Sequence, residues 1–507
     1  MQDGTLLAAV DLGSNSFRLE IGRLEHGQIQ RVEYLKETVR QGAGLDDKHE
    51  LTPEAMQRGW DCLARFAERL VGFARPQVRA VATQTLREAR NREDFIARGS
   101  AILGFPIDVV SGLEEARLIY KGVARMLPQS DERRLVVDIG GRSTELIVGR
   151  QFTPAAAASC RVGSVAWSAR YFADGAFTRS AFEAAELAAQ AVFDEVMTQF
   201  PRDSWDVAYG SSGTVGAAGS MLAPMLGQQG VITRGGLAWL QEQLLRARHV
   251  DRLRLEGLKD DRRAVIGGGL SILRAVFAQL GIERMTLASG AMRQGVLYDM
   301  LGRFHHRDMR DTTVAHFAKR YHSDTRQSRR VEEMALALLR QFSGDLRADA
   351  DYALHLLAWA ARLHEIGLSV AHSGYHKHSA YIIANADMPG FSKMEQAHLA
   401  LLVLAHRGTM EKMRGQISNN LDLAMVMALR LAVLFHRSHT ELRVPPMEAH
   451  CDGNTFRLSV EPQWVMANPL TAAAIKEEIR ECKKIGVTLE VLALADTDSE
   501  AELSAVG

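Results

Sequence analysis

The sequence predicts an α/β protein in which one strand-and-helix pattern occurs twice, followed by a helical region and a small α+β end. Between residues 5 and 301, short apolar runs alternate with stretches of helical spacing, which indicates a sheet covered by helices. A strand, an acid, a glycine turn and a second strand occur around Asp11 and again around Asp138, which indicates an internal duplication. From Val314 to Leu434 the spacing is helical almost throughout.

The first repeat opens with a predicted β-meander. Its three expected strands are TLLAAV (5–10), FRLEIGRLE (17–25) and QIQRVEYLKETVR (28–40). Thr52-Pro53-Glu54 is a helix start signal, and the apolar spacing that follows predicts a helix from Ala55 to Phe73. Beyond that helix we expect a strand at 78–83, a helix at 91–103, a strand at 106–111 and a helix at 112–127.

The second repeat begins with RLVVDIGGRSTELIVGR (134–150), which has the layout of residues 6–22. DVAYGSSGT (206–214) is the counterpart of VRAVAT (78–83), and MTLASGAMRQGVLYDML (285–301) closes this half with a strand, a glycine turn and a helix. The composition changes at 302–312, and Pro445-Pro446 marks a further boundary. The expected elements of the C-terminal part are two short strands, a helix from Thr471 to Lys484 and a final strand, all within 447–494.

Bulk composition excludes several classes of function. Lys+Arg and Asp+Glu both total 61, so no global field favours nucleic acid or an anionic membrane. The 4 cysteines are far apart and form no C-x-x-C pair, so we expect reduced thiols in the cytoplasm. No leader peptide and no apolar run of roughly 20 residues is visible. We therefore expect a cytoplasmic protein, with peripheral membrane association left open.

The strongest chemical signal is the pair of acid-bearing glycine turns. Asp11 ends a strand before Gly13-Ser14-Asn15-Ser16, and Asp138 ends a strand before Gly140-Gly141-Arg142-Ser143-Thr144. Glycine lets backbone N–H groups approach phosphate oxygens, and carboxylates can hold a hard cation such as Mg²⁺. One such turn is more simply a tight hairpin. Two copies, each at the end of a strand, favour phosphate binding.

Three further segments are candidates for the same site. SGLEEAR (111–117) opens a helix with two acids, which are either ordinary partners of the helix dipole or a base that activates water. ATQTLRE (82–88) carries Arg87, either a forked phosphate ligand or part of a solvated helix start. GSSGT (210–214) is another glycine turn rich in hydrogen-bond donors.

Together these motifs resemble the exopolyphosphatase/guanosine pentaphosphatase family, within the superfamily of actin, chaperone ATPases and sugar kinases. The resemblance is carried by AAVDLGSNSFRL, ATQTLREARN, VVSGLEEARLIYKGV, LVVDIGGRSTELIVG, YGSSGT, SGAMRQGVLYDM and LHEIGLSVAHSGYHKHSAYIIANADMPGF. It covers essentially the whole chain, and long bacterial exopolyphosphatases look most similar. The implied fold is two actin-like (ASKHA, ribonuclease H-like) domains at 1–124 and 125–304, an all-α HD-like domain at 305–445 and a small α+β domain at 446–507.

The resemblance also implies roles for single residues. Glu115 matches the catalytic base, while Asp138 and Glu145 match acids that bind magnesium and position water. The implied metal ligands are Asp11, Asp138 and Glu145, with Mg²⁺ as cofactor and a monovalent cation such as K⁺ left open. The implied phosphate ligands are Asn15, Ser16, Arg87, Gly140, Gly141, Ser143, Thr144, Gly213 and Thr214.

The chain departs from the family pattern in two places, and its helical region departs from a working HD site. Arg142 stands where the family has a third glycine, so its side chain either obstructs phosphate or adds a cation to it. Gln294 replaces an acid in the segment Ala291–Gly295. In the helical region Glu365 follows His364 where an HD site has Asp, and Arg329-Arg330 stand at the place of an early metal-binding His. We therefore expect no working second metal site.

From the resemblance we expect an exopolyphosphatase that releases orthophosphate processively from inorganic polyphosphate. The expected basic channel for the polymer comprises Arg303, Arg307, Arg310, His376, Lys377 and His378. The alternative is a guanosine pentaphosphate 5′-phosphohydrolase that yields guanosine tetraphosphate, since one cleft accepts either anion; the long C-terminal extension favours polyphosphate.

Two rivals of other classes are weaker. A sugar kinase or chaperone-type ATPase needs an adenosine pocket, which is not identifiable. A non-catalytic nucleotide or polyphosphate sensor is disfavoured because the acids at 115, 138 and 145 are present. As partners we expect no nucleic acid, and a second copy of the chain in a homodimer.

Overall fold

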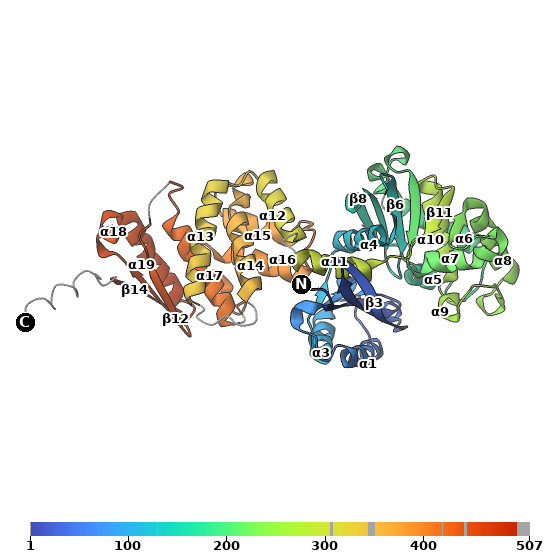
Figure 1. Cartoon of the computed structure of the whole chain (residues 1–507), viewed down its shortest axis with the longest axis horizontal. Coiled ribbons are helices and arrows are strands. Elements are labelled where there is room, and N and C mark those ends of the chain that lie inside the picture. Colours follow the sequence, from blue (N-terminus) through green and yellow to red (C-terminus); the bar gives the residue numbers. More distant parts are fainter. Residues whose placement is uncertain are drawn as a thin grey trace, which may run out of the picture. The chain divides into compact units, whose positions relative to one another are not determined.

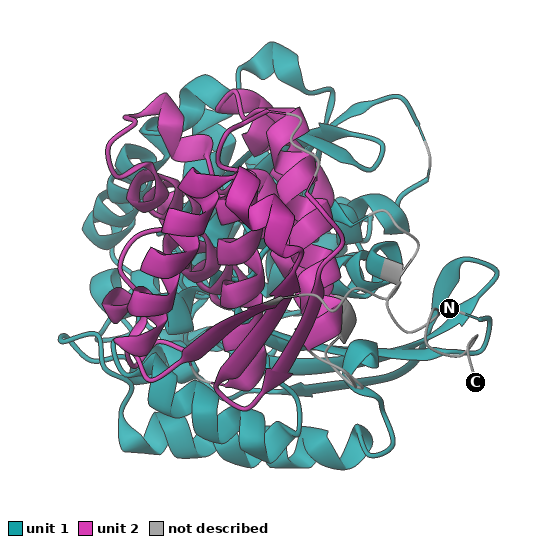
Figure 2. Ribbon diagram, turned by 90° about the vertical axis from the view of Figure 1, so that its left-hand side faces the viewer, with its two compact units in different colours: residues 1–309, 389–393 teal, residues 310–388, 394–507 magenta. Residues whose placement is uncertain are grey.

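The computed structural model describes residues 2–128, 130–304, 308–342, 350–417, 419–440 and 444–493, and its helices and strands are labelled in Figure 1. The chain forms two compact units (Figure 2). The first, here called the sheet unit, comprises Met1–Met309 and Pro389–Lys393. The second, the helical unit, comprises Arg310–Met388 and Met394–Gly507. The finer division into four domains stays a prediction.

The first lobe of the sheet unit is a five-stranded sheet in the order β3-β2-β1-β4-β5. Its elements are β1 (Leu6–Leu12), β2 (Phe17–Glu25), β3 (Gln28–Glu37), α1 (Pro53–Arg69), β4 (Val78–Ala82), α2 (Gln84–Glu88), α3 (Arg92–Leu103), β5 (Ile107–Val109) and α4 (Gly112–Met126). β1 pairs antiparallel with β2 and parallel with β4, so it lies in the middle of the sheet. Its apolar residues are buried on both faces, as the uninterrupted run TLLAAV predicts.

The second lobe is a six-stranded sheet in the order β10-β11-β9-β6-β7-β8. Its strands are β6 (Arg133–Ile139), β7 (Thr144–Arg150), β8 (Thr153–Cys160), β9 (Val207–Ser211), β10 (Val231–Thr233) and β11 (Arg284–Leu287). Its helices are α5 (Ser164–Tyr171), α6 (Arg179–Asp194), α7 (Ser212–Leu226), α8 (Arg234–Ala247), α9 (Asp260–Arg263), α10 (Ile266–Gln279) and α11 (Met292–Phe304). β6 pairs antiparallel with β7 and parallel with β9, which repeats the neighbours of β1. The repeat in sequence is thus a repeat in topology.

Helices α4 and α11 cross at a glycine-lined contact between the two sheets. A side chain on Gly295 would lie 1.8 Å from the carbonyl oxygen of Leu118, and one on Gly122 would lie 2.0 Å from that of Ala291. Only glycine permits this approach of two backbones. Buried residues of β1, β4, β6, β7, α4 and α11 form one apolar cluster around the crossing. The crossing therefore fixes the middle of α4 against α11.

The C-terminal half is mainly helical, as the spacing after Val314 predicts. Its helices are α12 (Met309–Arg320), α13 (Thr325–Phe342), α14 (Ala350–Leu363), α15 (Tyr375–Asn385), α16 (Lys393–Ala405) and α17 (Asn420–Phe435). Nearly all of α17 is buried, which its composition (LDLAMVMALRLAVLF) explains. The chain then forms β12 (Glu448–Asp452), β13 (Thr455–Val460), α18 (Pro462–Ala467), α19 (Pro469–Lys483) and β14 (Thr488–Ala493), with the sheet order β12-β13-β14.

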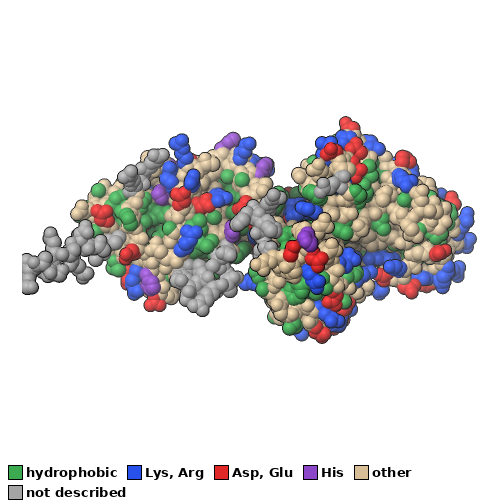
Figure 3. Space-filling view, in the orientation of Figure 1, with side chains coloured by type: hydrophobic (Ala, Val, Ile, Leu, Met, Phe, Trp, Pro, Cys, Tyr) green, Lys and Arg blue, Asp and Glu red, His purple; other side chains and the backbone are tan. Residues whose placement is uncertain are grey.

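The surface is mixed in charge. On the face drawn in Figure 3, basic and acidic side chains are interspersed over both units, in keeping with the formal charge of zero. No helix within the described ranges is both long and apolar enough to cross a membrane. The cytoplasmic location and the homodimer stay predictions.

Candidate active site

The two acid-bearing turns lie at equivalent places in the two sheets and approach each other. Asp11 is opposite Arg18 in the β1–β2 ladder, and Asp138 is opposite Glu145 in the β6–β7 ladder. A side chain on Gly141 would lie 2.9 Å from Cβ of Ser14, so glycine is needed for the turns to meet. The turns predicted to bind phosphate are therefore brought together by the fold.

Helix α4 carries Glu115 to the same place. The Ser111 hydroxyl caps the helix by accepting the N–H of Glu114 at 3.1 Å. Nη1 of Arg87 donates to Oε2 of Glu115 at 2.7 Å and to the carbonyl of Val110 at 2.9 Å. The same guanidinium donates twice more to Oε1 of Gln84. Arg87 thus orients the Glu115 carboxylate, and its predicted role as a phosphate ligand stays a prediction.

Four buried carboxylates, those of Asp11, Glu115, Asp138 and Glu145, share this place. Burial raises the pKa of Glu115, opposed mainly by Arg87 and reinforced by Asp138 and Asp11. Burial, with Glu115 and Asp138 adding, raises the pKa of Glu145 well above its usual range. Burial also raises the pKa of Asp138, against hydrogen bonds from Ser211 and Ser212. Such a crowded set of buried acids is typical of a site that takes a proton or a cation.

Several predicted phosphate ligands have donors without a protein acceptor. Nδ2 of Asn15, Oγ of Ser16 and Oγ1 of Thr214 are buried, and none has a hydrogen-bond partner among the described residues. Buried donors are nearly always satisfied, so these three indicate an acceptor supplied from outside the chain. By contrast, the Thr144 hydroxyl donates to the carbonyl of Val162 at 2.6 Å. Ser143 accepts the N–H of Gly140 with its carbonyl at 2.9 Å, which closes the second turn.

Both departures from the family pattern in this unit have structural partners. The Arg142 guanidinium pairs with Glu88 at 2.7 Å and donates to the carbonyl of Gly42 at 3.1 Å. The Arg142 side chain therefore extends from the second lobe to the first, where its guanidinium is bound by Glu88 and Gly42. Nε2 of Gln294 donates to both carboxylate oxygens of Glu20, at 2.7 and 2.6 Å. An acid at this position would repel Glu20, whereas the amide binds it.

Sequence reasoning missed two arginines beside the site. Arg18 pairs with Asp11 at 3.4 Å, and a side chain on Gly213 would lie 2.2 Å from Nη2 of Arg262. Burial, reinforced by the charge of Arg18, lowers the pKa of Arg262. The two guanidinium groups are thus close enough to repel each other, which favours an anion between or beside them. The signal for Arg18 was its register opposite Asp11; nothing local indicated Arg262.

A third missed feature is the backbone of Ser212, directly before Gly213. Its φ is 75°, a left-handed conformation that is uncommon for a residue other than glycine. Its hydroxyl donates to the carbonyl of Ile139 at 3.0 Å. This turn is therefore held in a strained form at the start of α7.

The residues predicted to form a basic channel are divided between the two units. Arg303 lies in the sheet unit and pairs with Asp299 at 3.4 Å, and Arg307 lies outside the described residues. Arg310 lies in the helical unit, is buried, and pairs with Glu395. The other three open α15, where burial and nearby cations lower the pKa of His376 to about 4. A polyphosphate channel at these residues stays a prediction.

The described residues contain no group of three or more His, Cys, Asp or Glu side chains arranged to hold a metal ion by themselves. This bears on the metal site predicted in the sheet unit and on the HD-like region, where no working site is expected. In the helical unit, His364 and Glu365 are buried and lie 3.6 Å apart, and Arg329 pairs with Glu333 at 2.8 Å. In the sheet unit, Mg²⁺ at the buried carboxylates stays a prediction. This ion is usually bound through one or two carboxylates, with water and substrate phosphate completing its shell.

Comparisons with known proteins agree over nearly the full length. The model of the Ppx/GppA phosphatase family matches residues 21–304, and that of Ppx/GppA phosphatase, domain III, matches residues 309–479. A Vibrio cholerae protein named guanosine-5′-triphosphate,3′-diphosphate pyrophosphatase is 40% identical over 96% of this chain and 98% of its own. A protein of the same name from Photobacterium profundum is 38% identical over 93% of this chain and 95% of its own.

Two solved structures share the fold over 59% of this chain and 98% of theirs. An exopolyphosphatase from Cytophaga hutchinsonii has 25% identity and a TM-score of 0.51. An exopolyphosphatase-like protein has 24% identity and a TM-score of 0.54. The α/β lobes are therefore those of an actin-like phosphatase fold, and the HD-like nature of the helical region stays a prediction.

The full-length relatives overturn the prediction of an exopolyphosphatase. Relatives from Vibrio cholerae and Vibrio parahaemolyticus that are 40% identical over 96% of the chain carry the guanosine name, so the alternative is the better-supported one. The error has a physical cause, because the turns and acids were predicted to bind a terminal phosphoryl group, and both substrates end in one.

Proposed function

We propose that this chain, which belongs to the Ppx/GppA phosphatase family, hydrolyses the terminal 5′ phosphoanhydride of guanosine 5′-triphosphate 3′-diphosphate. In this reaction a water oxygen bonds to the terminal phosphorus and the bond from that phosphorus to the bridging oxygen breaks. The products are orthophosphate and the guanosine 5′-diphosphate 3′-diphosphate. The substrate part of the proposal rests on full-length relatives of that name at 40% identity.

One observation carries the hydrolytic part: the carboxylate of Glu115, fixed by Arg87 at 2.7 Å, lies among other buried acids at the meeting of the two phosphate turns. Its raised pKa makes it a stronger base than an exposed glutamate. Glu115 accepts the proton from the attacking water, and Arg87 keeps the carboxylate oriented. The buried donors of Asn15, Ser16 and Thr214 are free to bind phosphate oxygens.

The proposal includes Mg²⁺ near Asp11, Asp138 and Glu145. These side chains are buried and carry oxygen ligands. Burial, with neighbouring acids adding, raises the pKa values of Asp138 and Glu145, and a bound cation would favour their ionised forms. When bound, the ion would offset charge on the terminal phosphates. Asp11 also forms ion pairs with Arg18 and Arg293, at 3.4 and 3.5 Å, so its carboxylate would bind the cation less strongly than those of Asp138 and Glu145. A role for K⁺ remains part of the proposal without a defined site.

Recognition of the guanosine substrate falls to Arg18 and Arg262. The Arg262 guanidinium lies beside Gly213, and burial together with the charge of Arg18 lowers the pKa of Arg262. A second phosphorylated arm would relieve that repulsion, and a 3′-diphosphate is such an arm. Inorganic polyphosphate lacks a branch, so it does not require the pair.

The test is phosphate release from guanosine 5′-triphosphate 3′-diphosphate and from long inorganic polyphosphate, at matched concentrations with Mg²⁺. We expect the guanosine substrate to have the higher kcat/KM. In Arg262→Ala, KM for it should rise by roughly 10-fold or more, the value of a lost charged hydrogen bond. Arg252→Ala, an exposed neighbour in sequence, is the matched control. Faster release from polyphosphate, or equal KM values in the two variants, would reject the substrate assignment.

A further inference from the structure

A five-residue segment from the helical half of the sequence is part of the sheet unit. Pro389–Lys393 clusters with Met1–Met309, although residues 388 and 394 on either side belong to the helical unit. The N–H of Gly390 donates to Oε2 of Glu114 at 2.8 Å, and its carbonyl accepts from Nη2 of Arg303 at 3.0 Å. Gly390 has φ 92°, a conformation that other residues rarely adopt. Glycine is thus needed to present both groups at once.

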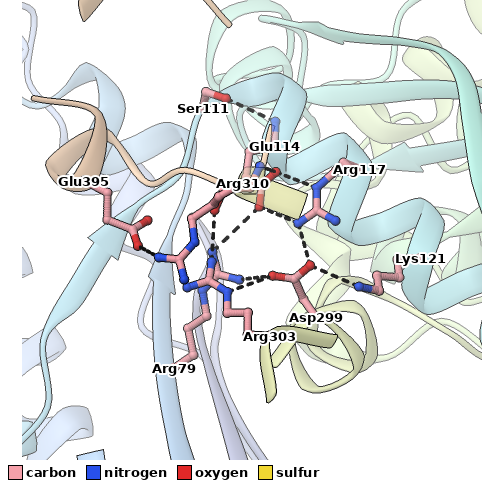
Figure 4. Close-up of polar contacts among 10 residues, drawn as sticks. Arg79, Ser111, Glu114, Arg117, Lys121, Asp299, Arg303, Arg310 and Glu395 are labelled. Atoms are coloured by element: carbon pink, nitrogen blue, oxygen red, sulfur yellow. Dashed lines mark hydrogen bonds and ion pairs between the residues drawn. The ribbon is translucent and has the colours of Figure 1, made fainter. Parts of the chain in front are cut away.

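Glu114 is the acid of the SGLEEAR segment to which the reaction assigns no role. It is 0% exposed, and both of its oxygens accept from Arg117 at 2.7 Å. Figure 4 shows Glu114, Arg117 and Lys121 projecting from α4 on the side where Asp299 of α11 lies. Arg117 and Lys121 contact Asp299 at 2.8 and 3.1 Å. Arg79 of β4 reaches Asp299 at 2.8 Å and Glu114 at 3.7 Å.

This network holds the same helical turn that carries Glu115. Consecutive residues of a helix point about 100° apart, so Glu114 faces the network while Glu115 faces the phosphate turns. The opposite side of the turn is also confined, since a side chain on Gly112 would lie 2.6 Å from Cβ of Ser159. Ser159 in turn donates to Glu145 at 2.8 Å. A small rotation of α4 would therefore move the Glu115 carboxylate.

We propose that Gly390 and Glu114 are positioning residues for Glu115. The segment Pro389–Lys393 fixes Glu114 through the Gly390 N–H, Glu114 fixes the first turn of α4, and that turn directs the Glu115 carboxylate at the attacking water. The inference rests on the proposed function, in which Glu115 is the base. It makes activity depend on a segment encoded far from both phosphate turns.

The experiment compares Gly390→Ala with Gly415→Ala in the full-length chain. Both glycines have positive φ, 92° and 76°, so alanine strains the backbone in each. A side chain on Gly415 would meet nothing within 4 Å, which makes it the matched control. The readouts are kcat and KM for phosphate release, and hydrogen exchange of the amides at 113–117.

We expect Gly390→Ala to lower kcat by about 10-fold, because small displacements of a catalytic group are costly, and to leave KM within about 3-fold. Exchange at 113–117 should be faster than in the wild type. Gly390→Asn should restore part of kcat, since Asn tolerates positive φ better than Ala. Gly415→Ala should match the wild type in kcat and in exchange.

Equal kcat values for Gly390→Ala and Gly415→Ala would overturn the inference, as would a parallel change of kcat and KM. If the wild type releases no phosphate from the guanosine substrate, the proposed function fails. The exchange measurement then still decides the inference: unchanged exchange at 113–117 in Gly390→Ala rejects it, and faster exchange supports it.

Discussion

Glu114 and Glu115 are adjacent in the sequence and both buried, yet their surroundings are opposite in charge. On the side of α4 that faces α11, which we call its back, several cations pair with Glu114 and Asp299. The charges of Arg117, Lys121, Arg303 and Arg79 hold the pKa of Asp299 well below its usual range despite burial. On the side of α4 that faces the two glycine turns, which we call its front, Glu115 pairs with Arg87 and lies near further acids. Burial and these acids raise its pKa.

The difference separates structural from chemical use of buried charge. A matched cluster stabilises one arrangement of helices, and removing one member leaves an uncompensated charge. A cluster with more acids than cations destabilises the protein when no ligand is bound. Such a cluster is typical of a site where a cation, a proton or a substrate balances the negative charge. The front of α4 is therefore assigned to catalysis and the back to positioning.

Removing the divalent cation should have the largest effect on the front cluster. Chelation with EDTA is expected to reduce phosphate release by at least about 10³-fold, because the acids and the substrate phosphates then repel each other. Added Mg²⁺ should restore activity and raise the Tm of the wild type more than that of Asp138→Asn. Full activity in EDTA, or an equal rise of Tm in both proteins, would show that no divalent cation acts at the acids around Glu115.

Breaking the matched cluster should mainly reduce stability. Glu114→Ala leaves Arg117 without its bidentate partner at a buried position, and we expect the free energy of unfolding to fall by about 3–5 kcal/mol. Urea unfolding followed by circular dichroism measures this. Arg480→Ala, which removes an exposed pair with Glu477 in α19, is the control and should cost less than about 1 kcal/mol. Similar losses in the two variants would contradict the matched cluster.

The two clusters should also differ in how pH changes stability when no divalent cation is present. The lowered pKa of Asp299 means that its ionised form stabilises the fold above its ordinary range, and that this gain is lost as pH falls. Asp299→Asn should therefore destabilise by about 1–3 kcal/mol at pH 8 and by the same amount at pH 5, because the gain is lost only below the ordinary pKa of 3.8. The raised pKa of Glu115 has the opposite sign, because its ionised form costs stability at high pH.

Glu115→Gln is accordingly expected to be neutral or stabilising at pH 8, with a smaller difference from the wild type at pH 5. Denaturant unfolding at the two pH values, in chelator, gives both comparisons. Loss of stability in Glu115→Gln that matches Asp299→Asn at pH 8 would show that the two clusters are alike.

The strands, the glycine turns and the acids at positions 11, 115, 138 and 145 follow from local pattern. A buried strand with a Gly-rich end can be recognised from a dozen residues. The pairing of Glu114 with Gly390 could not be predicted, because it joins positions that only the complete fold brings together. Arg262 was missed for the same reason. The substrate was misjudged because motifs around a terminal phosphoryl group carry no information on what lies behind it.

The most direct test of the central claim is phosphate release from guanosine 5′-triphosphate 3′-diphosphate by Glu115→Gln, measured under single-turnover conditions with Mg²⁺. The substitution keeps the hydrogen bond to Arg87 and removes the base. We predict a rate about 10³-fold below that of the wild type, with the substrate Kd changed by less than about 3-fold. A rate within about 10-fold of the wild type would contradict the assignment of Glu115 as the base.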